Sequence, residues 1–550
     1  MKKSDIRYAS LPLALTMVLS ACSSGAGSNS GTTDAPSAPA KTSETTAPAA
    51  AESEGSEFLV SEKPVELSWF VQNDSKVTAT MKDFSEMKIM PILKEATNVT
   101  INFKQPPVGM ESEQFNLMIS SGDLTDMIYW NWSAYPGGPE KALRDGVIIP
   151  LNDLVDKHAP NFKRFLEENP HIQRDIMTDD GTLYTFPITR DGDWPKFVFG
   201  FQLRQDWLDR LNLEVPKTMD DWYNVLTAFK NSDPNVIPFG NQTPSKIGDM
   251  PLLHFMSAWG MAYGFYQVDG SVKFGAAQPE YKEFLATMKK WYDEGLIDPD
   301  FSATDGKQFD AKVTGHRLGS FGAMLNGGMG RLSDLMKDDP NFKLVGAPFP
   351  TAKDGKSYNF HYDARSPFPG FGNAVSSKSK KAVEAVKWMD VAYSEWGHNL
   401  MNFGIEGETY NWVDGYPKYT DLVLKNDSMP AVNVLAQYTM ASVNGRFFQQ
   451  DSRYFEQILT YPQQKEASMT WSQASIERQM PIITPTSDES SRLASTMSEI
   501  NTYADEMLLK FITGRESLDN FDAYVERLYQ MNLEEAISIQ QAALERYKQR

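Results

Sequence analysis

The sequence predicts an α/β fold in two lobes, because strand-like and helix-like segments alternate and because the chain is long and rich in aromatic residues. A first strand is predicted at 65–71 (VELSWFV), a helix at 87–96 and a second strand at 100–103. A further helix at 113–120 precedes a strand at 127–130. Such alternation predicts a mostly parallel sheet covered by helices.

The size of the chain predicts a second lobe. The chain has 550 residues, of which about 490 follow residue 60, and it contains 31 Phe, 22 Tyr and 12 Trp. This is more than one compact core usually holds, so two lobes are expected. Later helices are predicted at 220–230, 280–294 and 380–393, and over most of 518–550.

The start of the chain has the pattern of an export signal. Basic residues precede an apolar run at 11–19, which is too short to span a bilayer. The tetrad at 19–22 (LSAC) ends on Cys22, the only cysteine, and resembles the lipobox of bacterial lipoproteins. This resemblance implies that residues 1–21 are a signal peptide and that Cys22 carries a diacylglyceryl group. An ordinary secretory signal would leave the position of the sole thiol unexplained.

Residues 22–57 are predicted to be a lipidated, disordered stalk. They are almost entirely small, polar or acidic and contain no aromatic residue, so they cannot bury enough apolar surface to fold. With its anchor at Cys22, the protein is expected at the extracytoplasmic face of the cell membrane. The net charge of -19 argues against nucleic acid or anionic lipid as a partner. We expect a monomer.

Several short segments follow one another in a characteristic order and spacing. The stretch at 121–130 reads SGDLTDMIYW. Supporting pieces are 151–154 (LNDL), 203–208 (LRQDWL), 215–218 (VPKT), 294–297 (EGLI) and 402–407 (NFGIEG). Together these segments resemble the large extracellular solute-binding lipoproteins of carbohydrate ABC importers, the LipO type, which are related to alginate-binding proteins and have an S-G-D-x-x-D strand entrance.

This resemblance implies a two-lobed, periplasmic-binding-protein-like fold of type II, in which crossover segments join the lobes beside an interlobe cleft. Lobe one is expected at 64–187 plus 372–465, and lobe two at 188–371 plus 466–550. The resemblance also implies the function: a substrate-binding protein that captures a sugar or oligosaccharide by hinge closure and delivers it to the transmembrane subunits of an ABC permease. No cofactor is expected.

One segment departs from the family pattern. Many large members carry a calcium loop, D-P-N-G-N-G followed by acidic residues, which has the alternating oxygen ligands of an EF-hand. Here the stretch at 233–238 reads DPNVIP and the later acidic residues are absent. We therefore predict no metal at this position. The acidic stretches at 179–181 and 191–193 are predicted to be turns.

Ligands of α/β folds bind beyond the carboxyl ends of the strands, which places Tyr129, Trp130 and Trp132 at the rim of the expected cleft. A pyranose matches an aromatic plane and polar edges. The other candidate ligand-binding residues are Trp194, Trp259, Tyr266, Asn326, Asp363, Arg365, Glu406, Tyr410 and Trp412. The alternative for each aromatic ring is ordinary core or surface packing. The alternative is a capping or surface role for Glu406 and a plain turn for Asn326. Asp363 and Arg365 could instead pair with each other or with neighbouring residues.

Two other functions are compatible with parts of the sequence. A surface glycoside hydrolase would need two carboxylates about 5 to 10 Å apart, but the chain has no G-x-S-x-G or H-E-x-x-H motif and only six His. We therefore expect no enzyme and no catalytic residues. The same fold with a peptide or another small solute as ligand is the second alternative. The sequence leaves open which sugar binds, its length and its charge.

Overall fold

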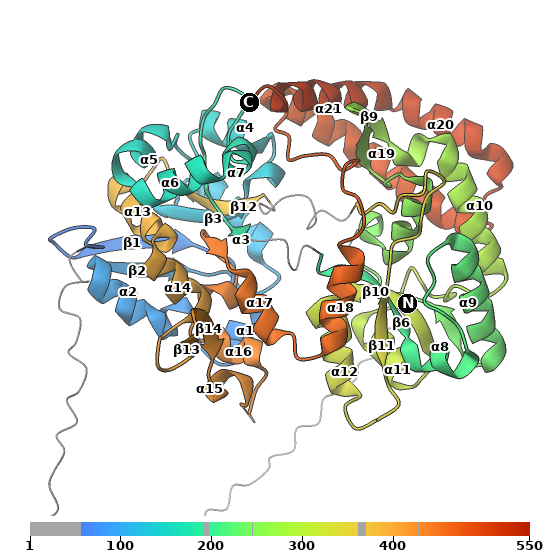
Figure 1. Ribbon diagram of the computed structural model, residues 1–550. Helices are drawn as coiled ribbons and strands as arrows, with labels where there is room; N and C mark the ends of the chain where they lie inside the picture. The colour runs from blue at the N-terminus through green and yellow to red at the C-terminus, as the bar shows by residue number, and fades with distance from the viewer. Residues whose placement is uncertain (1–56, 192–196, 245, 361–369, 427) are drawn as a thin grey trace, which may run out of the picture. The chain divides into compact units, whose positions relative to one another are not determined.

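A computed structural model describes residues 57–191, 197–244, 246–360, 370–426 and 428–550, which belong to one compact unit (Figure 1). The fold has two lobes, each with its own sheet and its own hydrophobic core. We call lobe one the elements around the five-stranded sheet and lobe two the elements around the four-stranded sheet. In the described ranges, no helix has the length and hydrophobicity needed to cross a bilayer.

The sheet of lobe one has the order β2-β1-β3-β12-β4. Its strands are β1 (Val65–Phe70), β2 (Val99–Lys104), β3 (Met127–Asn131), β4 (Phe186–Pro187) and β12 (Phe371–Val375). β1 pairs with β2 and β3 in parallel, whereas β12 is antiparallel to both of its neighbours. The strand β12 therefore lies inside the sheet although it follows β3 by 240 residues, counted from Asn131 to Phe371.

Helices cover both faces of this sheet. The larger core lies on one face, and a smaller core around Phe115 and Trp132 lies on the other. The helices before the first crossover are α1 (Ser75–Thr78), α2 (Ile89–Thr97), α3 (Glu111–Ser121), α4 (Gly138–Arg144), α5 (Asn152–His158), α6 (Pro160–Glu168) and α7 (Pro170–Asp175). Those after β12 are α13 (Ala382–Asp390), α14 (Glu395–Phe403), α15 (Asp421–Leu424), α16 (Ala431–Leu435) and α17 (Ser452–Ile458).

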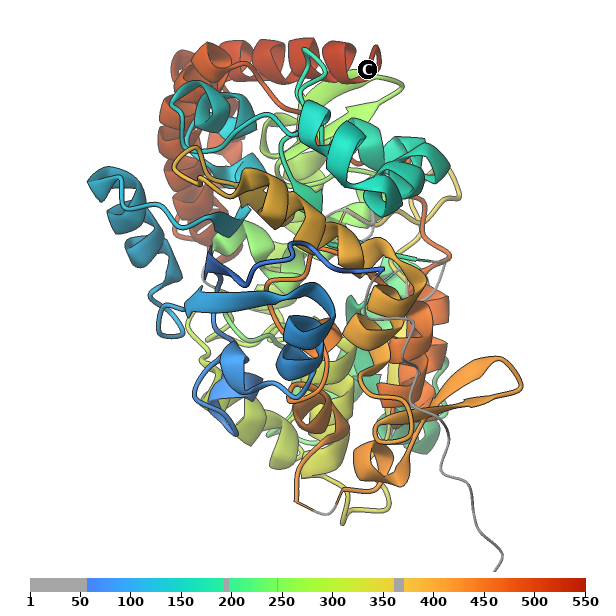
Figure 2. The same cartoon turned by 90° about the vertical axis from the view of Figure 1, so that its left-hand side faces the viewer.

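Two small strand pairs complete lobe one. β13 (Tyr410–Val413) and β14 (Tyr416–Tyr419) form a hairpin, drawn in orange in Figure 2. β5 (Thr189–Arg190) and β15 (Gln449–Gln450) pair in parallel. The second pair joins the chain just after β4 to the segment before α17, so both segments are fixed to lobe one.

The sheet of lobe two has the order β11-β6-β10-β7. Its strands are β6 (Phe199–Arg204), β7 (Ile237–Phe239), β10 (Leu318–Met324) and β11 (Leu344–Ala347). β6 is antiparallel to β10 and β11, and only β10 and β7 are parallel. A separate hairpin is formed by β8 (Phe265–Val268) and β9 (Ser271–Phe274).

The helical layer of lobe two includes the last part of the chain. Its helices are α8 (Gln205–Leu211), α9 (Met219–Ser232), η4 (Pro251–Trp259), α10 (Pro279–Asp293), α11 (Gly306–Thr314), η6 (Leu325–Gly330), α12 (Arg331–Leu335), α18 (Pro462–Trp471), α19 (Ser487–Ile512), α20 (Phe521–Gln530) and α21 (Leu533–Tyr547). Buried residues of α19, α20 and α21 belong to the same core as β6.

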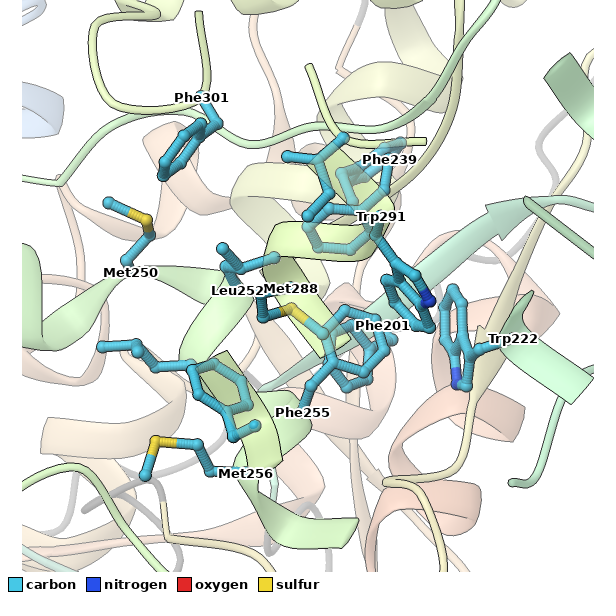
Figure 3. Packing of buried hydrophobic residues seen from close by; sticks show 14 of the residues in the cluster. Phe201, Trp222, Phe239, Met250, Leu252, Phe255, Met256, Met288, Trp291 and Phe301 are labelled. Carbon is cyan, nitrogen blue, oxygen red and sulfur yellow. The ribbon is translucent and has the colours of Figure 1, made fainter. Parts of the chain in front are cut away.

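Aromatic side chains fill the core of lobe two (Figure 3). Phe255 of η4 stacks on Phe201 of β6 with ring centroids 4.4 Å apart. It also meets Trp222 edge-on at 5.0 Å and Trp291 at 5.3 Å. The segment η4 is apolar on nearly its whole circumference, which explains why it lies inside the lobe and holds its neighbours in fixed positions.

The predicted strands and helices are confirmed at nearly all positions, with ends shifted by one to three residues. The expectation of a mostly parallel sheet holds for strand direction, with one exception in each sheet: β12 in lobe one and β6 in lobe two are antiparallel to both of their neighbours. Parallel neighbours arise when a strand is followed by a helix that returns to the same sheet. Strands β6 and β12 instead arrive from the other lobe through a crossover, so no such connection fixes their direction.

Candidate functional site

The carboxyl ends of the parallel strands of lobe one meet at one edge of its sheet. β1 ends at Phe70, β2 at Lys104 and β3 at Asn131. β12 begins at the same edge, because Phe371 pairs with Asn131. We call this the lobe-one edge. It is where ligands of α/β sheets are expected.

Trp130 presents part of its ring at the lobe-one edge. It is half-buried and lies parallel to Phe115 of α3, with ring centroids 3.9 Å apart and planes tilted by only 1°. One ring face is therefore covered by a phenylalanine. The exposed remainder of the indole is rigidly held, as a stacking surface for a ligand needs to be.

The neighbours of Trp130 are core residues in this structure. Trp132 has no exposed surface, and its Nε1 donates a hydrogen bond to the carbonyl of Gly372 at 3.1 Å. Tyr129 points to the opposite face of the sheet, where it stacks on Phe371 at 5.6 Å. Burial raises the pKa of Tyr129 to about 12, so its hydroxyl stays protonated.

Polar side chains gather beside the lobe-one edge from a segment that the sequence analysis did not select. Asn444 Nδ2 donates to the carbonyl of Asn73, which follows β1, at 3.0 Å. Asn373 of β12 donates to the carbonyl of Gly445 at 3.3 Å. Arg446 is half-buried, and its Nη1 donates to Ala441 at 3.2 Å. Residues 444–446 thus lie beside the end of β1 and the middle of β12.

Some buried polar atoms in this region lack a partner among the described residues. These atoms are Arg446 Nε, Asn373 Oδ1 and Gln450 Oε1. Buried polar groups in folded proteins are nearly always hydrogen-bonded, so atoms of this kind need water or a ligand. Guanidinium and amide groups are suited to hydroxyl groups, because together they offer donors and acceptors.

The corresponding edge of lobe two follows from its strand directions. Met324, the last residue of β10, pairs with Phe199, the first residue of β6. Ala347, the last residue of β11, pairs with Phe201. Because β7 is parallel to β10, its carboxyl end lies on the same side. The crossover after β4 enters lobe two at this edge, and the chain returns toward β12 from it, so the crossovers connect the two edges.

A pocket lined by aromatic rings lies beside the edge of lobe two. It has a volume of about 190 Å³ and includes His254 and Ser257 of η4 and Phe349, which follows β11. The His254 ring lies 4.8 Å from Phe199 and 6.0 Å from Phe349. Pockets for drug-sized ligands occupy about 300–1,000 Å³, so this one is suited to a single ring. Its remaining lining includes Tyr263, Phe265, Tyr358 and Phe360.

The candidate ligand-binding residues that the sequence predicts in lobe two lie near this pocket, but their side chains form hydrogen bonds or ring contacts with other residues of the protein. Trp259, at the end of η4, is half-buried and donates from Nε1 to Glu283 at 3.0 Å. Tyr266 is buried and meets Phe360 edge-on at 6.0 Å. Asn326 of η6 accepts a hydrogen bond from Gln464 of α18 at 2.9 Å.

The remaining selected residues are placed as follows. Glu406 is exposed in the turn before the β13–β14 hairpin, where its backbone is bridged to Tyr410. Tyr410 is buried beside Phe403, and Trp412 is 41% exposed on the hairpin. Trp194, Asp363 and Arg365 lie outside the described residues.

Two of the three acidic stretches have local explanations, and residues 192 and 193 of the third lie outside the described residues. Asp233 ends α9, and its Oδ1 accepts from the backbone and side-chain nitrogens of Asn235 at 2.8 and 3.2 Å. The chain then enters β7 directly at Ile237. Gly181 donates to Thr178 in the predicted turn at 179–181. Over the described ranges, no three side chains of His, Cys, Asp or Glu are close enough together to hold a metal ion.

A model of one protein family matches residues 77–397, more than half of the chain; its members are described as bacterial extracellular solute-binding proteins. The chain belongs to this family. This solute-binding protein has relatives in several bacteria. It is 27% identical over 495 residues to FusA, the fructooligosaccharide ABC transporter substrate-binding protein of Streptococcus pneumoniae, covering 85% of this chain and 88% of FusA. It is 24% identical to lipoprotein LipO of Bacillus subtilis, covering 66% and 71% of the two chains.

Solved structures share the fold of this solute-binding protein. Alginate-binding protein AlgQ2 without calcium ion superimposes with a TM-score of 0.71 at 26% identity, covering 89% of this chain and 99% of AlgQ2. FusA in complex with kestose gives a TM-score of 0.70 at 23% identity, covering 88% and 99%. These matches span both sheets, which confirms the two-lobed fold expected for the solute-binding protein from its sequence.

Proposed function

We propose that this solute-binding protein serves a carbohydrate ABC importer, capturing a sugar or oligosaccharide and delivering it to the transmembrane subunits. The observation that carries the proposal is the similarity to FusA, a fructooligosaccharide-binding protein, over 85% of this chain. The similarity to AlgQ2, an alginate-binding protein, points to the same ligand class. The family consists of binding proteins, and we infer that this member also catalyses no reaction.

We propose that the sugar binds between the lobe-one edge and the aromatic pocket of lobe two. Trp130 would stack on an apolar sugar face, and Arg446 and Asn373 would bond hydroxyl groups through atoms that have no partner among the described residues. In lobe two, His254 and Phe349 would hold one ring. Of the other candidates, Trp194, Trp259, Asn326, Asp363, Arg365, Glu406 and Trp412 keep a proposed contact role, whereas the buried rings of Tyr129, Trp132, Tyr266 and Tyr410 are assigned to packing inside the lobes.

Capture would proceed by closure of the lobes. Each lobe supplies only part of the proposed site, so the ligand contacts both parts only when the lobes approach. This differential affinity shifts the population toward the closed form. The hinge segments are the crossovers. The expected bounds, lobe one at 64–187 plus 372–465 and lobe two at 188–371 plus 466–550, shift by a few residues, because β5 and β12 belong to lobe one and α18 belongs to lobe two. The permease would recognise the closed form.

The protein would act at the extracytoplasmic membrane face. We propose cleavage after residue 21, diacylglyceryl modification of Cys22, and a flexible stalk over 22–57 that carries a monomeric binding unit. Mass spectrometry of the membrane-bound protein tests this anchor. A diacylglyceryl mass on the peptide that begins with Cys22, together with release of a Cys22→Ser variant from the membrane, is expected. An unmodified Cys22 would refute the anchor and leave the binding proposal intact.

Calorimetric titration of the purified protein with mono- and oligosaccharides, including kestose, tests the ligand class. We expect saturable binding of one sugar class. Arg446→Ala should weaken the affinity for this sugar about ten- to a hundredfold, because the loss of one hydrogen bond to a charged group changes the binding free energy by that factor. Arg492→Ala is the matched control, because Arg492 forms an exposed ion pair with Glu535. Binding of peptides but of no sugar would overturn the ligand class.

A further inference from the structure

The last helix, α21, packs with lobe two but ends on lobe one. Leu533, at its start, belongs to the core that contains the lobe-two sheet. Leu544, near its end, is buried with Val272 of β9 and with Met480. The helix therefore moves with lobe two. Its last turn and the following residues contact the segment 174–179, whose Ile176 belongs to the core of lobe one.

These contacts are charged and numerous. Tyr547 Oη donates to Asp175 Oδ1 at 2.6 Å. Arg550 Nε donates to Asp179 Oδ1 at 2.9 Å, and its Nη1 donates to the carbonyl of Met177 at 2.8 Å. Arg546 Nε also pairs with Asp179. One carboxylate of lobe one is thus shared by two guanidinium groups from α21 and its extension.

A second set of contacts ties the start of α19 into the same place. Arg546 bonds both oxygens of Glu489, with Nη2 2.5 Å and Nη1 3.2 Å from them. Glu489 completes the capping box of α19. Arg144 of α4, in lobe one, pairs with Ser487 at the first turn of α19. We call the set Asp175, Asp179, Glu489, Arg546, Tyr547 and Arg550 the C-terminal clamp.

The clamp is mostly shielded from water. The side chain of Arg550 is 5% exposed, that of Asp179 15% and that of Glu489 17%. Pulling the lobes apart here would break the ion pairs of Asp179 with Arg546 and Arg550 and the bond from Tyr547 to Asp175, while Arg546 would keep its pair with Glu489. Breaking several partly buried charged contacts at once is unfavourable. Screening by salt is also weak for such groups. The clamp should therefore stay closed while other parts of the lobes move.

We propose that the C-terminal clamp is a fixed pivot about which lobe two rotates during ligand capture. This inference rests on the proposed function for the need to close, but no residue of the clamp is itself a proposed ligand contact. A pivot restricts the open form to a narrow range of orientations. Losing it would spread the unliganded protein over many orientations, of which only a fraction can bind.

Distance measurements by electron spin resonance on the unliganded full chain test this pivot. Spin labels are attached to exposed positions on the two lobes, using Glu95→Cys on α2 and Lys307→Cys on α11. Cys22→Ser removes the only natural thiol. We expect a narrow distance distribution, and one about twofold wider when Asp179→Asn and Arg550→Gln break the clamp.

Arg492→Ala is the control, because it breaks an ion pair between α19 and α21 that lies wholly within lobe two. It should leave the distribution narrow. A clamp variant with unchanged width, or a control variant that widens equally, would overturn the pivot. Circular dichroism of both variants confirms that each lobe remains folded. If the clamp variant does not fold, the single change Tyr547→Phe, which removes only the bond to Asp175, is measured instead and should widen the distribution less.

Ligand affinity gives a second readout. The clamp variant should bind the sugar found by calorimetry about fivefold more weakly, since the binding-competent fraction falls. Unchanged affinity would refute the pivot. Because the distance measurement needs no ligand, failure of the pivot and failure of the proposed ligand class are distinguishable.

Discussion

Replacing Trp132 by phenylalanine distinguishes a core residue from a ligand contact. Trp132 is fully buried and its Nε1 donates to Gly372, a residue of the central strand β12. Trp132→Phe leaves that carbonyl without its donor, which costs about 1–3 kcal/mol. It also removes apolar contact worth about 1 kcal/mol, at roughly 25 cal/mol per Å² over about 40 Å². The expected loss of unfolding free energy is about 2–4 kcal/mol.

Urea unfolding followed by circular dichroism measures this loss. Trp412→Phe is the matched control, because Trp412 is 41% exposed on the β13–β14 hairpin. Its unfolding free energy should change by less than about 0.5 kcal/mol. Sugar affinity of the folded Trp132→Phe protein should remain that of the unchanged chain. A stability loss below about 0.5 kcal/mol, or a large loss of affinity without destabilisation, would refute the assignment of Trp132 to the core.

Three further predictions follow from local geometry. A methyl group added at Gly275 would lie 1.6 Å from the carbonyl oxygen of Ala262, so Gly275→Ala should lower the free energy of unfolding in urea by at least about 3 kcal/mol. The control Gly264→Ala has open space around the new methyl group and should leave that free energy unchanged. Equal effects of the two variants would contradict this packing. Burial raises the pKa of Asp390 from 3.8 to about 6, because the folded protein favours the protonated carboxyl group. The contribution of this group to the free energy of unfolding is therefore complete below about pH 4 and is lost as the pH rises through 6. Asp390→Asn should remove a decline of about 3 kcal/mol between pH 4 and 7, and an unchanged pH profile would show that the group is not perturbed. Because the Asp233 turn lacks the later ligands, millimolar calcium should move the thermal midpoint by less than about 1 °C, whereas a shift of several degrees would reveal a bound ion.

The sequence specifies the local elements well and their partners poorly. The strands at 65–70, 99–104 and 127–131 follow from their apolar runs and flanking turns, and the first turn of α9 follows from its capping residues. The neighbours of β3 and β10 do not follow, because β12 and β6 reach them from the other lobe. Nothing in the sequence at 371–375 predicts that this strand pairs with β3.

The candidate site shows the same division. Alternation along β3 places Tyr129 and Trp130 on opposite faces, which the period of a strand predicts. That Trp130 retains an exposed part depends on Phe115, which a separate helix brings beside it. Asn373 and Gly445 are 72 positions apart but are joined by a hydrogen bond, which brings Arg446, the next residue, close to β12. No spacing or motif in the sequence predicts this contact between β12 and the segment at 445–446.

The place of β12 in its sheet bears on how the protein reaches its final state. Between β3 and β4, lobe one has a gap that only residues 371–375 fill, and all of the first-half strands are made before those residues exist. A chain emerging from a ribosome or a translocation pore therefore cannot complete lobe one early, and contacts this distant in sequence form slowly. The sheet of lobe one therefore stays incomplete until most of the protein has been synthesised. A chain that is still unfolded can pass through a translocation pore, which suits a polypeptide that has to cross a membrane before it folds.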